Sequence, residues 1–367
     1  MTALALVLTA CSTATGEGGG SPSPSSPPSS SVTSSSTTAS TPSTPTVAIS
    51  GAPKALADAV ATKYGDRPVT GEAELGTWRG AKVAVVTAAD DVTLAVRPKG
   101  RTGWKVVGGW WPSLGEKGSD DLGGARHVLV IGSDARPGQD VERSRADAIQ
   151  LLGVDGSGGG GLMGFARDLW VPIPGHGHGK LNSAMVFAGP AGEVQSVASI
   201  SGIDVDGYVV TGFEGFKAIT NELGGLNFHA PEALDSHLTG GQLKKGYNHL
   251  DGTEALAYAR ERKSLPRGDF DRSRHQGLLI LAAAIQARVK GPGSLPHALS
   301  VIDEHASSDL TAEEMLLFTA SVFRVNPLEV GHAVAQGPTG MQSGQSIVRL
   351  DDDSRRAFRD FRDGRLD

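Results

Sequence analysis

The sequence has little cysteine, no excess of positive charge and no long hydrophobic segment. Cys11 is the only cysteine among 367 residues, so no intrachain disulfide can form. The net charge of −6 excludes nucleic-acid binding through bulk charge, because counterion release requires a basic surface. The apolar run at residues 4–10 is too short to cross a bilayer. A strongly anionic ligand would therefore need a local basic pocket.

Arginine is absent between Arg167 and Arg260 and then becomes frequent. Five arginines fall within fifteen residues, at positions 260, 262, 267, 272 and 274. A guanidinium group can direct two hydrogen bonds to one phosphate or carboxylate, whereas a lysine ammonium acts as a point charge. The cluster therefore indicates an anion site, although composition alone is equally compatible with a solvated, salt-bridged segment.

The first 46 residues predict an anchor and a tether. The apolar run ends in Leu8-Thr-Ala-Cys11, which resembles a bacterial lipoprotein cleavage site, so residues 1–11 are interpreted as a signal with lipidation at Cys11. The alternative is a chance apolar start. Residues 12–46 are almost entirely Ser, Thr, Pro, Gly and Ala, and cannot bury enough apolar surface to fold. The expected location is the extracytoplasmic face of the cell membrane, with the chain lipid-anchored.

Residues 47–118 are predicted to form a small α+β domain. Large apolar residues recur every fourth position from Leu56 to Tyr64, and Gly65 follows, which predicts a short helix closed by glycine. The tryptophans at 110 and 111 are interpreted as core residues rather than as a sugar-binding pair. Strands are expected at residues 83–86, 92–96 and 104–107.

Residues 119–367 are predicted to form a larger α/β domain. Residues 128–131 are an unbroken apolar run, and Asp134 and Arg136 follow at once. A buried strand that ends in charged residues is a common place for binding groups. The two residues are therefore candidates for a site, the alternative being a simple salt bridge within the loop.

A hairpin is predicted where two apolar segments flank a glycine-rich turn. Residues 148–154 and 161–165 should pair antiparallel, and centring the pairing on Ser157 sets Asp147 opposite Arg167. An ordinary cross-strand ion pair is the alternative to a functional role. The register gathers four charged side chains at one end of the hairpin, namely Arg145, Asp147, Arg167 and Asp168.

Three helices are predicted further along. Apolar spacing marks residues 213–223, with Gly224 as the stop, and Asp251 with Glu254 has the form of a capping box. Residues 278–289 are strongly apolar, which suits a helix that covers a sheet or one that lines an apolar channel.

Three further segments are predicted to have no catalytic or binding role. The histidines at 176 and 178 lack a third ligand at zinc-type spacing, so a flexible glycine loop is expected there. The run at 157–161 lacks the Gly-Lys-Ser/Thr of a phosphate loop and is read as a turn. Residues 351–356 mix both charge signs and are expected to be a solvated surface.

Several short motifs occur in order between positions 132 and 276. They are Gly132-Ser-Asp134-Ala-Arg136-Pro, Arg145-Ala-Asp147, Arg167-Asp168 before Val171-Pro-Ile-Pro174, Lys180-Leu-Asn182, Gly207-Tyr-Val-Val-Thr-Gly-Phe213, Leu223-Gly-Gly225, Leu250-Asp-Gly-Thr-Glu-Ala-Leu-Ala-Tyr-Ala-Arg260-Glu-Arg262, and Gly268-Asp269-Phe-Asp-Arg272 ending in His275-Gln276. Together they resemble the LytR-CpsA-Psr family of cell-wall glycopolymer ligases. The resemblance leaves out the tether and the small domain.

The resemblance implies an α/β/α catalytic domain whose sheet carries a lipid-lined pocket. It also implies an extracytoplasmic phosphotransferase that moves a glycopolymer from a polyprenyl-pyrophosphate carrier onto peptidoglycan. The expected partners are the polyprenyl-pyrophosphate-linked glycan, a peptidoglycan acceptor, and the membrane through the lipid anchor; no nucleic acid is expected.

The resemblance also assigns roles to residues. Asp134 and Asp147 match the aspartates that hold Mg²⁺, the expected cofactor. Asp168 and Asp269 are the catalytic candidates, either orienting groups or acting as a base, and the choice between them stays open. The expected pyrophosphate ligands are Arg167, Arg260, Arg262, Arg272 and Gln276, to which Arg136 and Arg145 are added.

Two departures and two other functions are considered. Ala166 stands where the family usually has proline, and His275 stands where it often has arginine, so His275 adds charge only where it is protonated. One alternative function is a non-catalytic binding protein for polyprenyl-linked glycopolymers. The other is a polyprenyl-pyrophosphate hydrolase, in which water replaces the acceptor hydroxyl.

Overall fold

The computed structural model describes residues 46–115, 121–235 and 242–366. The predicted lipidation site Cys11 and all but the last residue of the 12–46 tether lie outside this part of the chain. Within the described residues, no helix combines the length and the apolar character that crossing a membrane requires.

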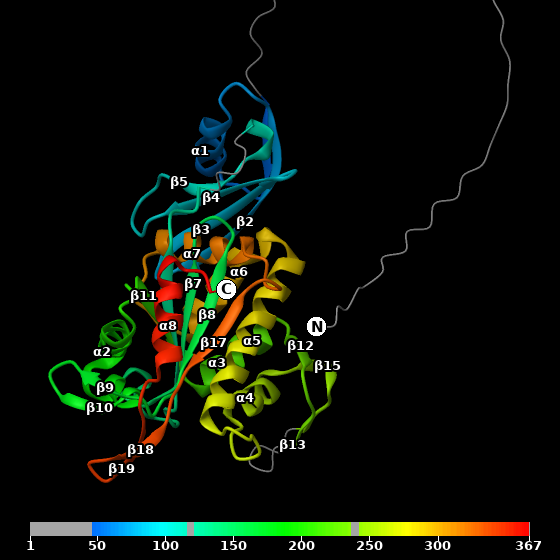
Figure 1. Ribbon diagram of the computed structural model, residues 1–367. Coiled ribbons are helices and arrows are strands. Elements are labelled where there is room, and N and C mark those ends of the chain that lie inside the picture. The colour runs from blue at the N-terminus through cyan, green and yellow to red at the C-terminus, as the bar shows by residue number, and fades with distance from the viewer. Residues whose placement is uncertain (1–45, 116–120, 236–241, 367) are drawn as a thin grey trace, which may run out of the picture. The chain divides into compact units, whose positions relative to one another are not determined.

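The N-terminal part of the described chain is a five-stranded sheet with one helix (Figure 1). The predicted helix is α1, Lys54–Tyr64, and its apolar residues Leu56, Val60 and Tyr64 are buried. Trp110 and Trp111 are 7% and 1% exposed, which confirms them as core residues. The strands in sheet order are β1 Val47–Ser50, β2 Val69–Trp78, β3 Ala81–Ala88, β4 Asp91–Arg97 and β5 Lys105–Trp110, with the turn η1 at Pro112–Leu114.

A six-stranded mixed sheet forms the centre of the larger part. Its β6–β7–β8 meander is antiparallel, while β11 and β17 join β6 and β8 in parallel. Parallel neighbours need crossover connections, and helices supply them. The strands in sheet order are β16 Ser307–Ser308, β11 Gly207–Thr211, β6 Arg126–Ser133, β7 Ala146–Val154, β8 Gly160–Phe165 and β17 Gly331–Ala335.

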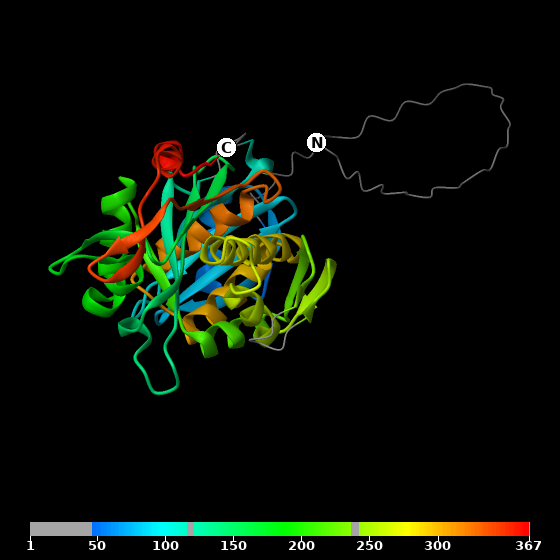
Figure 2. The same cartoon turned by 60° about the horizontal axis from the view of Figure 1, so that its bottom comes forward.

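Helices cover both faces of the central sheet, which confirms the α/β/α expectation (Figures 1 and 2). One face carries α2 Ala184–Ser201 and α8 Asp352–Asp360, and the other carries α3 Phe213–Glu222, α4 Gly252–Arg260 and α5 Asp269–Lys290. Two further helices, α6 Leu295–His305 and α7 Ala312–Arg324, pack against the five-stranded sheet.

Short hairpins and turns complete the described chain. The paired strands are β9 Trp170–Ile173 with β10 Gly177–Lys180, β12 Leu226–Ala230 with β15 Gly246–Leu250, β13 Leu234–Asp235 with β14 Gln242–Leu243, and β18 Thr339–Gln342 with β19 Gln345–Val348. The 3-10 turns are η2 Val141–Arg143, η3 Leu181–Ser183, η4 Pro292–Ser294 and η5 Phe361–Asp363.

Side chains of strand β6 enter two different hydrophobic cores, one on each face of the central sheet. On β6, Leu129 and Ile131 are fully buried in a core shared with α2 and α8, including Phe358. Val128 points the other way, into a core shared with α7 and with the five-stranded sheet. Because successive side chains on a strand face opposite sides, one apolar run serves both cores.

The prediction of a glycine loop at the two histidines needs correction, whereas that of a solvated surface at 351–356 is confirmed. The segment with His176 and His178 is a β-hairpin turn and strand rather than a loose loop, because β10 pairs with β9 in antiparallel register. The charged side chains of residues 352, 353, 355 and 356 are exposed as predicted, and the same segment opens helix α8, where Asp351 caps the helix and Phe358 is buried. Charge pattern alone missed this helix because its apolar side is narrow.

Helix α2 contains a fully buried carboxyl group. The helix is interrupted at Gly189, where φ is 70°, and Pro190 follows. Glu193 is 0% exposed, and its Oε2 accepts a hydrogen bond from the Met185 amide at 2.9 Å. Burial raises the pKa of Glu193 well above its ordinary value of 4.5, although the Met185 bond acts in the opposite direction.

We expect Glu193→Gln to gain stability relative to the natural chain as pH rises. Above the ordinary pKa of a glutamate, folding takes up a proton at Glu193, so the free energy of unfolding falls with pH until the raised folded-state pKa is passed. The amide carries no such linkage. Urea unfolding at about pH 5 and about pH 8 measures the difference. Glu214→Gln, at an exposed glutamate, is the control, and identical pH slopes in all three proteins would refute the prediction.

Candidate functional site

The hairpin register brings Asp147 and Arg167 together as predicted. Strands β7 and β8 pair Gln150 with Gly164 and Val154 with Gly160, which is the register centred on Ser157. Beyond the paired residues, Nη1 of Arg167 lies 2.5 Å from Oδ1 of Asp147. The turn chemistry at 155–159 thus fixes an ion pair at the far end of the hairpin.

On its other edge β7 has an irregularity at Asp147. The pairing with β6 passes from Gly132 opposite Ala148 to Ser133 opposite Ala146, so Asp147 has no partner in the ladder. Such a bulge turns a side chain away from the regular alternation and is frequent beside active sites. Next to it, Asp134 exchanges two bonds with Arg145: its amide donates to the Arg145 carbonyl at 2.9 Å, and its Oδ1 accepts from the Arg145 amide at 3.2 Å.

The second half of the arginine cluster belongs to helix α5. Asp269 and Arg272 lie one turn apart, and Nη2 of Arg272 is 2.8 Å from Oδ1 of Asp269. Nη1 of Arg272 is 3.9 Å from Oδ2 of Asp147. Arg167 and Arg262 also approach Asp269 Oδ1, at 3.6 and 4.0 Å. Two carboxylates are therefore surrounded by three guanidinium groups from three separate segments.

Burial and the carboxylates act in opposite directions on these arginines. For Arg272, 5% exposed, burial is the largest influence and lowers the pKa, while Asp269 and Asp147 raise it. For Arg167, burial again lowers the pKa, but Asp147 and Asp269 outweigh it and the net change is upward. A guanidinium group stays protonated in either case, so the cluster keeps its positive charges.

Arg260 and Arg136 both lie against the aromatic ring of Phe213, to which the sequence analysis assigned no separate role. The guanidinium carbon of Arg260 is 4.4 Å from the ring centroid of Phe213, and that of Arg136 is 5.5 Å away. Both distances fall within the range of a cation–π contact. The signal in the sequence was the position of Phe213 at the end of the Gly207-to-Phe213 motif, where α3 begins.

Gln276 links three elements beside this cluster. Its Nε2 donates to the carbonyls of Asp147 and Ala259, at 3.3 and 3.1 Å. Its Oε1 accepts a bond from Gln150 at 3.3 Å. Gln150 is itself buried and also donates to Ser273. Gln276 thus holds β7, α4 and α5 together, and Gln150 is a supporting residue that the sequence analysis missed.

The other predicted residues lie near this centre with different partners. Asp168 pairs with Lys180 of β10, with Nζ 3.1 Å from Oδ1. Arg136 and Arg145 are exposed, on the loop between β6 and β7. Arg267, which belongs to the arginine cluster but is not a predicted ligand, forms an ion pair with Asp271, with Nη2 2.7 Å from Oδ1.

His275 adds no charge to the site at neutral pH. It is 2% exposed, and its ring stacks on Tyr258 with the centroids 4.3 Å apart. Burial is the main reason why its pKa falls to about 4, and Asp271 only partly opposes this. His275 is therefore a neutral packing residue at this position.

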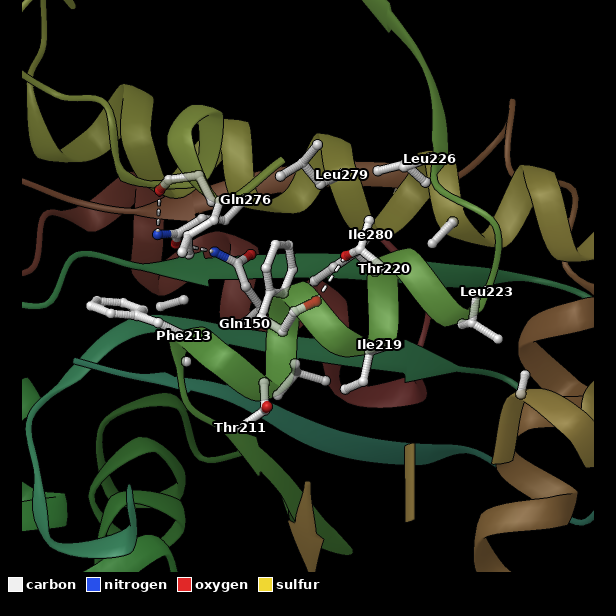
Figure 3. A pocket seen from close by; sticks show the side chains of 18 of the residues that line it. Gln150, Thr211, Phe213, Ile219, Thr220, Leu223, Leu226, Gln276, Leu279 and Ile280 are labelled. Atoms are coloured by element: carbon white, nitrogen blue, oxygen red, sulfur yellow. Dashed lines mark hydrogen bonds between the residues drawn. The ribbon is translucent and has the colours of Figure 1, made fainter. Parts of the chain in front are cut away.

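An apolar cavity of about 280 Å³ runs from the charged cluster along helix α5 (Figure 3). Gln150, Gln276 and Phe213 lie at one end, and Leu223 and Leu226 lie toward the other. Helix α5 both packs on the sheet and lines the cavity, so the two roles considered for residues 278–289 are combined. The walls are mainly Phe216, Ile219, Leu223, Leu256, Leu279, Ile280 and Ala283, and the charged end carries Asp147 and Arg260.

The described residues also include one acidic and histidine group outside this site. Glu222, Glu304 and His305 have ligand atoms within 4.8 Å of one another, and Glu222 and Glu304 are exposed. His305 Nε2 lies 2.7 Å from Glu222 Oε1, which a simple ion pair or hydrogen bond explains.

A model of the LytR_cpsA_psr family matches residues 115–360 of this chain. A curated relative, the polyisoprenyl-teichoic acid–peptidoglycan teichoic acid transferase TagT of Bacillus subtilis, is 32% identical over 185 residues. That match covers 48% of this chain and 56% of TagT. The probable cell wall biosynthesis protein LcpB of Corynebacterium glutamicum is 30% identical over 179 residues, which are 46% of this chain and 42% of LcpB. The chain thus spans about half the length of these relatives.

Solved structures show the same fold. The crystal structure of Bacillus subtilis TagV superimposes with a TM-score of 0.56 at 24% identity, over 65% of this chain and 98% of TagV. A structure of TagT bound to LI-WTA superimposes with a TM-score of 0.54 at 23% identity, over 66% of this chain and 91% of that chain.

Proposed function

Because this chain belongs to the LytR_cpsA_psr family, we propose that it transfers a glycopolymer from a polyprenyl-pyrophosphate carrier onto peptidoglycan. The observation that carries the proposal is the apolar cavity with arginines at one end. A ligand with a strongly anionic head and a long apolar tail matches both parts of this site. The names of TagT and LcpB, which refer to teichoic acid transfer and cell wall biosynthesis, support it.

The pyrophosphate is proposed to bind among the guanidinium groups. Arg167, Arg262 and Arg272 already surround Asp147 and Asp269, and a pyrophosphate would compete with these carboxylates for the same donors. Arg260 lies beside Asp147 at the cavity, against Phe213. The remaining proposed ligands are Arg136, Arg145 and Gln276.

Asp134 and Asp147 fit a Mg²⁺ ion as a set of donors. Mg²⁺ in phosphoryl-transfer sites commonly takes one or two carboxylates together with substrate phosphates and water. The Asp134 carboxylate accepts one backbone bond, from Arg145, and Asp147 is turned out of the ladder by the bulge. When bound, the ion would neutralise charge that develops on the pyrophosphate.

The proposed reaction is an attack of an acceptor hydroxyl oxygen on phosphorus. The bond from oxygen to the phosphorus that bears the glycan forms, the bond from that phosphorus to the bridging oxygen breaks, and polyprenyl phosphate leaves. The arginines stabilise the negative charge that accumulates on the leaving group. The hydroxyl proton passes to a base, for which Asp168 and Asp269 remain the two candidates.

The proposed location follows from the substrate and from the N-terminal segment. Peptidoglycan lies outside the cytoplasmic membrane, so the folded part would act on the extracytoplasmic face. Lipidation at Cys11 would hold the chain at that membrane, with residues 12–46 as the tether.

The function is tested with residues 46–367, a polyprenyl-pyrophosphate-linked glycan, peptidoglycan and Mg²⁺. We expect glycan transfer in the natural chain and a strong loss in Arg260→Ala, because this exposed arginine lies at the cavity with little role in the core. Arg267→Ala, from the same sequence cluster but paired with Asp271, is the matched control. Lipid binding without turnover would favour the non-catalytic binding protein, and phosphate release without a glycan product would favour the hydrolase.

A further inference from the structure

The cavity ends against helix α6, and α6 is held by the five-stranded sheet. The far end of the cavity is lined by Lys290 of α5, Ser294 of η4, and His297 and Ala298 of α6. Gln276 and Lys290 stand at opposite ends of this lining on α5, about 21 Å apart at 1.5 Å of helix rise per residue. Only an occupant that spans most of this length would meet α6.

The opposite face of α6 contacts strand β2. Pro296, Ser300 and Asp303 follow the helical spacing of one face, whereas His297 and Ala298 are turned roughly 100° and 200° from Pro296. The Thr77 amide donates to Ser300 Oγ at 2.8 Å, and the Arg79 amide donates to Asp303 Oδ1 at 2.9 Å. Backbone groups of β2 and of the turn that follows it are thus bonded to side chains of the helix that closes the cavity.

Gly76 shows how closely β2 and α6 approach. A Cβ atom at Gly76 would lie 2.1 Å from the carbonyl oxygen of Pro296 and 2.8 Å from Ser300 Oγ. Real Cβ atoms do not come so near to backbone oxygen, so only glycine permits this contact. Any larger residue must separate the strand from the first turn of the helix.

The same sheet also surrounds α6 with apolar contacts. Leu295 and Leu299 are 2% and 0% exposed, in a core that includes Val83 and Val85 of β3. Trp78, 1% exposed, donates from Nε1 to the carbonyl of Leu310, between β16 and α7, at 2.9 Å. Close-packed interiors transmit a shift of one element to its neighbours. The position of α6 therefore depends on the sheet.

We propose that the five-stranded sheet sets the depth of the cavity through β2 and α6, and so selects the length of the prenyl tail. The inference rests on the proposed function, since it takes the occupant to be a polyprenyl pyrophosphate. It gives residues 47–110, which lie outside the family match, a part in substrate selection. Gly76 and Ser300 are positioning residues, because neither lines the cavity.

The test compares two lipids of one headgroup. Geranyl pyrophosphate has a tail too short to reach α6, whereas decaprenyl pyrophosphate has more than enough length. In Gly76→Ala the new methyl group pushes α6 away from β2, toward the cavity. We expect decaprenyl pyrophosphate to bind about tenfold more weakly, with binding of geranyl pyrophosphate unchanged, by titration calorimetry. Ser300→Ala removes the acceptor for the Thr77 amide and the hydroxyl that donates to the Pro296 carbonyl, but adds no atom between β2 and α6. It should shift the ratio of the two lipid affinities in the same direction by less.

The matched control is Gly71→Ala, on the same strand. Its Cβ would lie 2.4 Å from the Thr87 carbonyl of β3, so it strains the sheet without meeting α6. The inference would be overturned if Gly76→Ala and Gly71→Ala lost the same affinity for decaprenyl pyrophosphate. It would also be overturned if Gly76→Ala lost the same affinity for both lipids. If Gly76→Ala does not fold, an unchanged ratio of the two lipid affinities in Ser300→Ala overturns the inference. A natural chain that binds neither lipid would instead refute the proposed function.

Discussion

Arg272→Ala is expected to abolish most glycan transfer and to destabilise the fold at the same time. The side chain is 5% exposed, 2.8 Å from Asp269 and 3.9 Å from Asp147. Its loss leaves two carboxylates, each 20% exposed, with one cation fewer, and Arg167 remains beside them. The cost is therefore at most about 3–5 kcal/mol of unfolding free energy, the range for a fully buried charge that loses its partner. Loss of one preorganised group that stabilises developing charge lowers the rate by roughly 10²–10³-fold. Transfer assays below the melting temperature and urea unfolding measure the two effects.

Arg288→Ala separates the two effects of Arg272→Ala. Arg288 lies on the same helix, and its Nη1 donates to the carbonyls of Phe323, Arg324 and Val325 at 2.8–3.2 Å. Its loss should lower stability but spare transfer while the protein stays folded. Arg272→Lys, which keeps the charge and loses the planar fork, should fall between the natural chain and Arg272→Ala. Equal transfer by Arg272→Ala and Arg288→Ala would refute a catalytic role for Arg272.

Asp147→Asn is expected to lower transfer by roughly 10²–10³-fold with little change in shape. The Asp147 carboxylate is 2.5 Å from Arg167 and 3.9 Å from Arg272, and it is one of the two proposed Mg²⁺ ligands. An amide keeps the size of the side chain but leaves the guanidinium charges unbalanced and offers the ion a neutral donor. We therefore expect the Mg²⁺ concentration for half-maximal transfer to rise together with the loss of rate.

The control for Asp147→Asn is the same change at Asp58. Asp58 pairs with Lys54 on the exposed surface of α1, so its amide variant should match the natural chain in both rate and Mg²⁺ dependence. Mg²⁺ binding to the two variants and the natural chain, measured by calorimetry without lipid, gives a readout independent of turnover. Unchanged Mg²⁺ dependence in Asp147→Asn would refute the metal role, even if the rate falls.

The β7–β8 hairpin shows which features of the site can be predicted from residues that are close in the sequence. Two apolar runs and one glycine-rich turn determined the β7–β8 register, and the register determined that Asp147 meets Arg167. The same is true of the capping box at Asp251, where the Asp251 side chain accepts from the Glu254 amide and the Glu254 side chain accepts from the Asp251 amide. These features depend on residues that are close in the chain, so turn and helix geometry suffice to predict them.

Other features of the site depend on packing between distant segments. The bulge at Asp147 arises from the pairing with β6, and no sequence pattern marked it. His275 could have been a cation by type, and only its burial against Tyr258 made it neutral. Phe213 contacts both Arg136 and Arg260 because α3, the end of α4 and the β6–β7 loop come together around its ring.

The sequence by itself determined the α/β class, the order of the site motifs and the chemical types of their side chains. Only the tertiary structure decided which of those charges share one cluster, that the cavity follows α5, and that β2 meets α6. The physical reason is the separation along the chain between the residues that interact. Periodicity, capping and turn chemistry act over a few residues, whereas the bond from Thr77 to Ser300 joins segments 223 residues apart and exists only once both cores have packed.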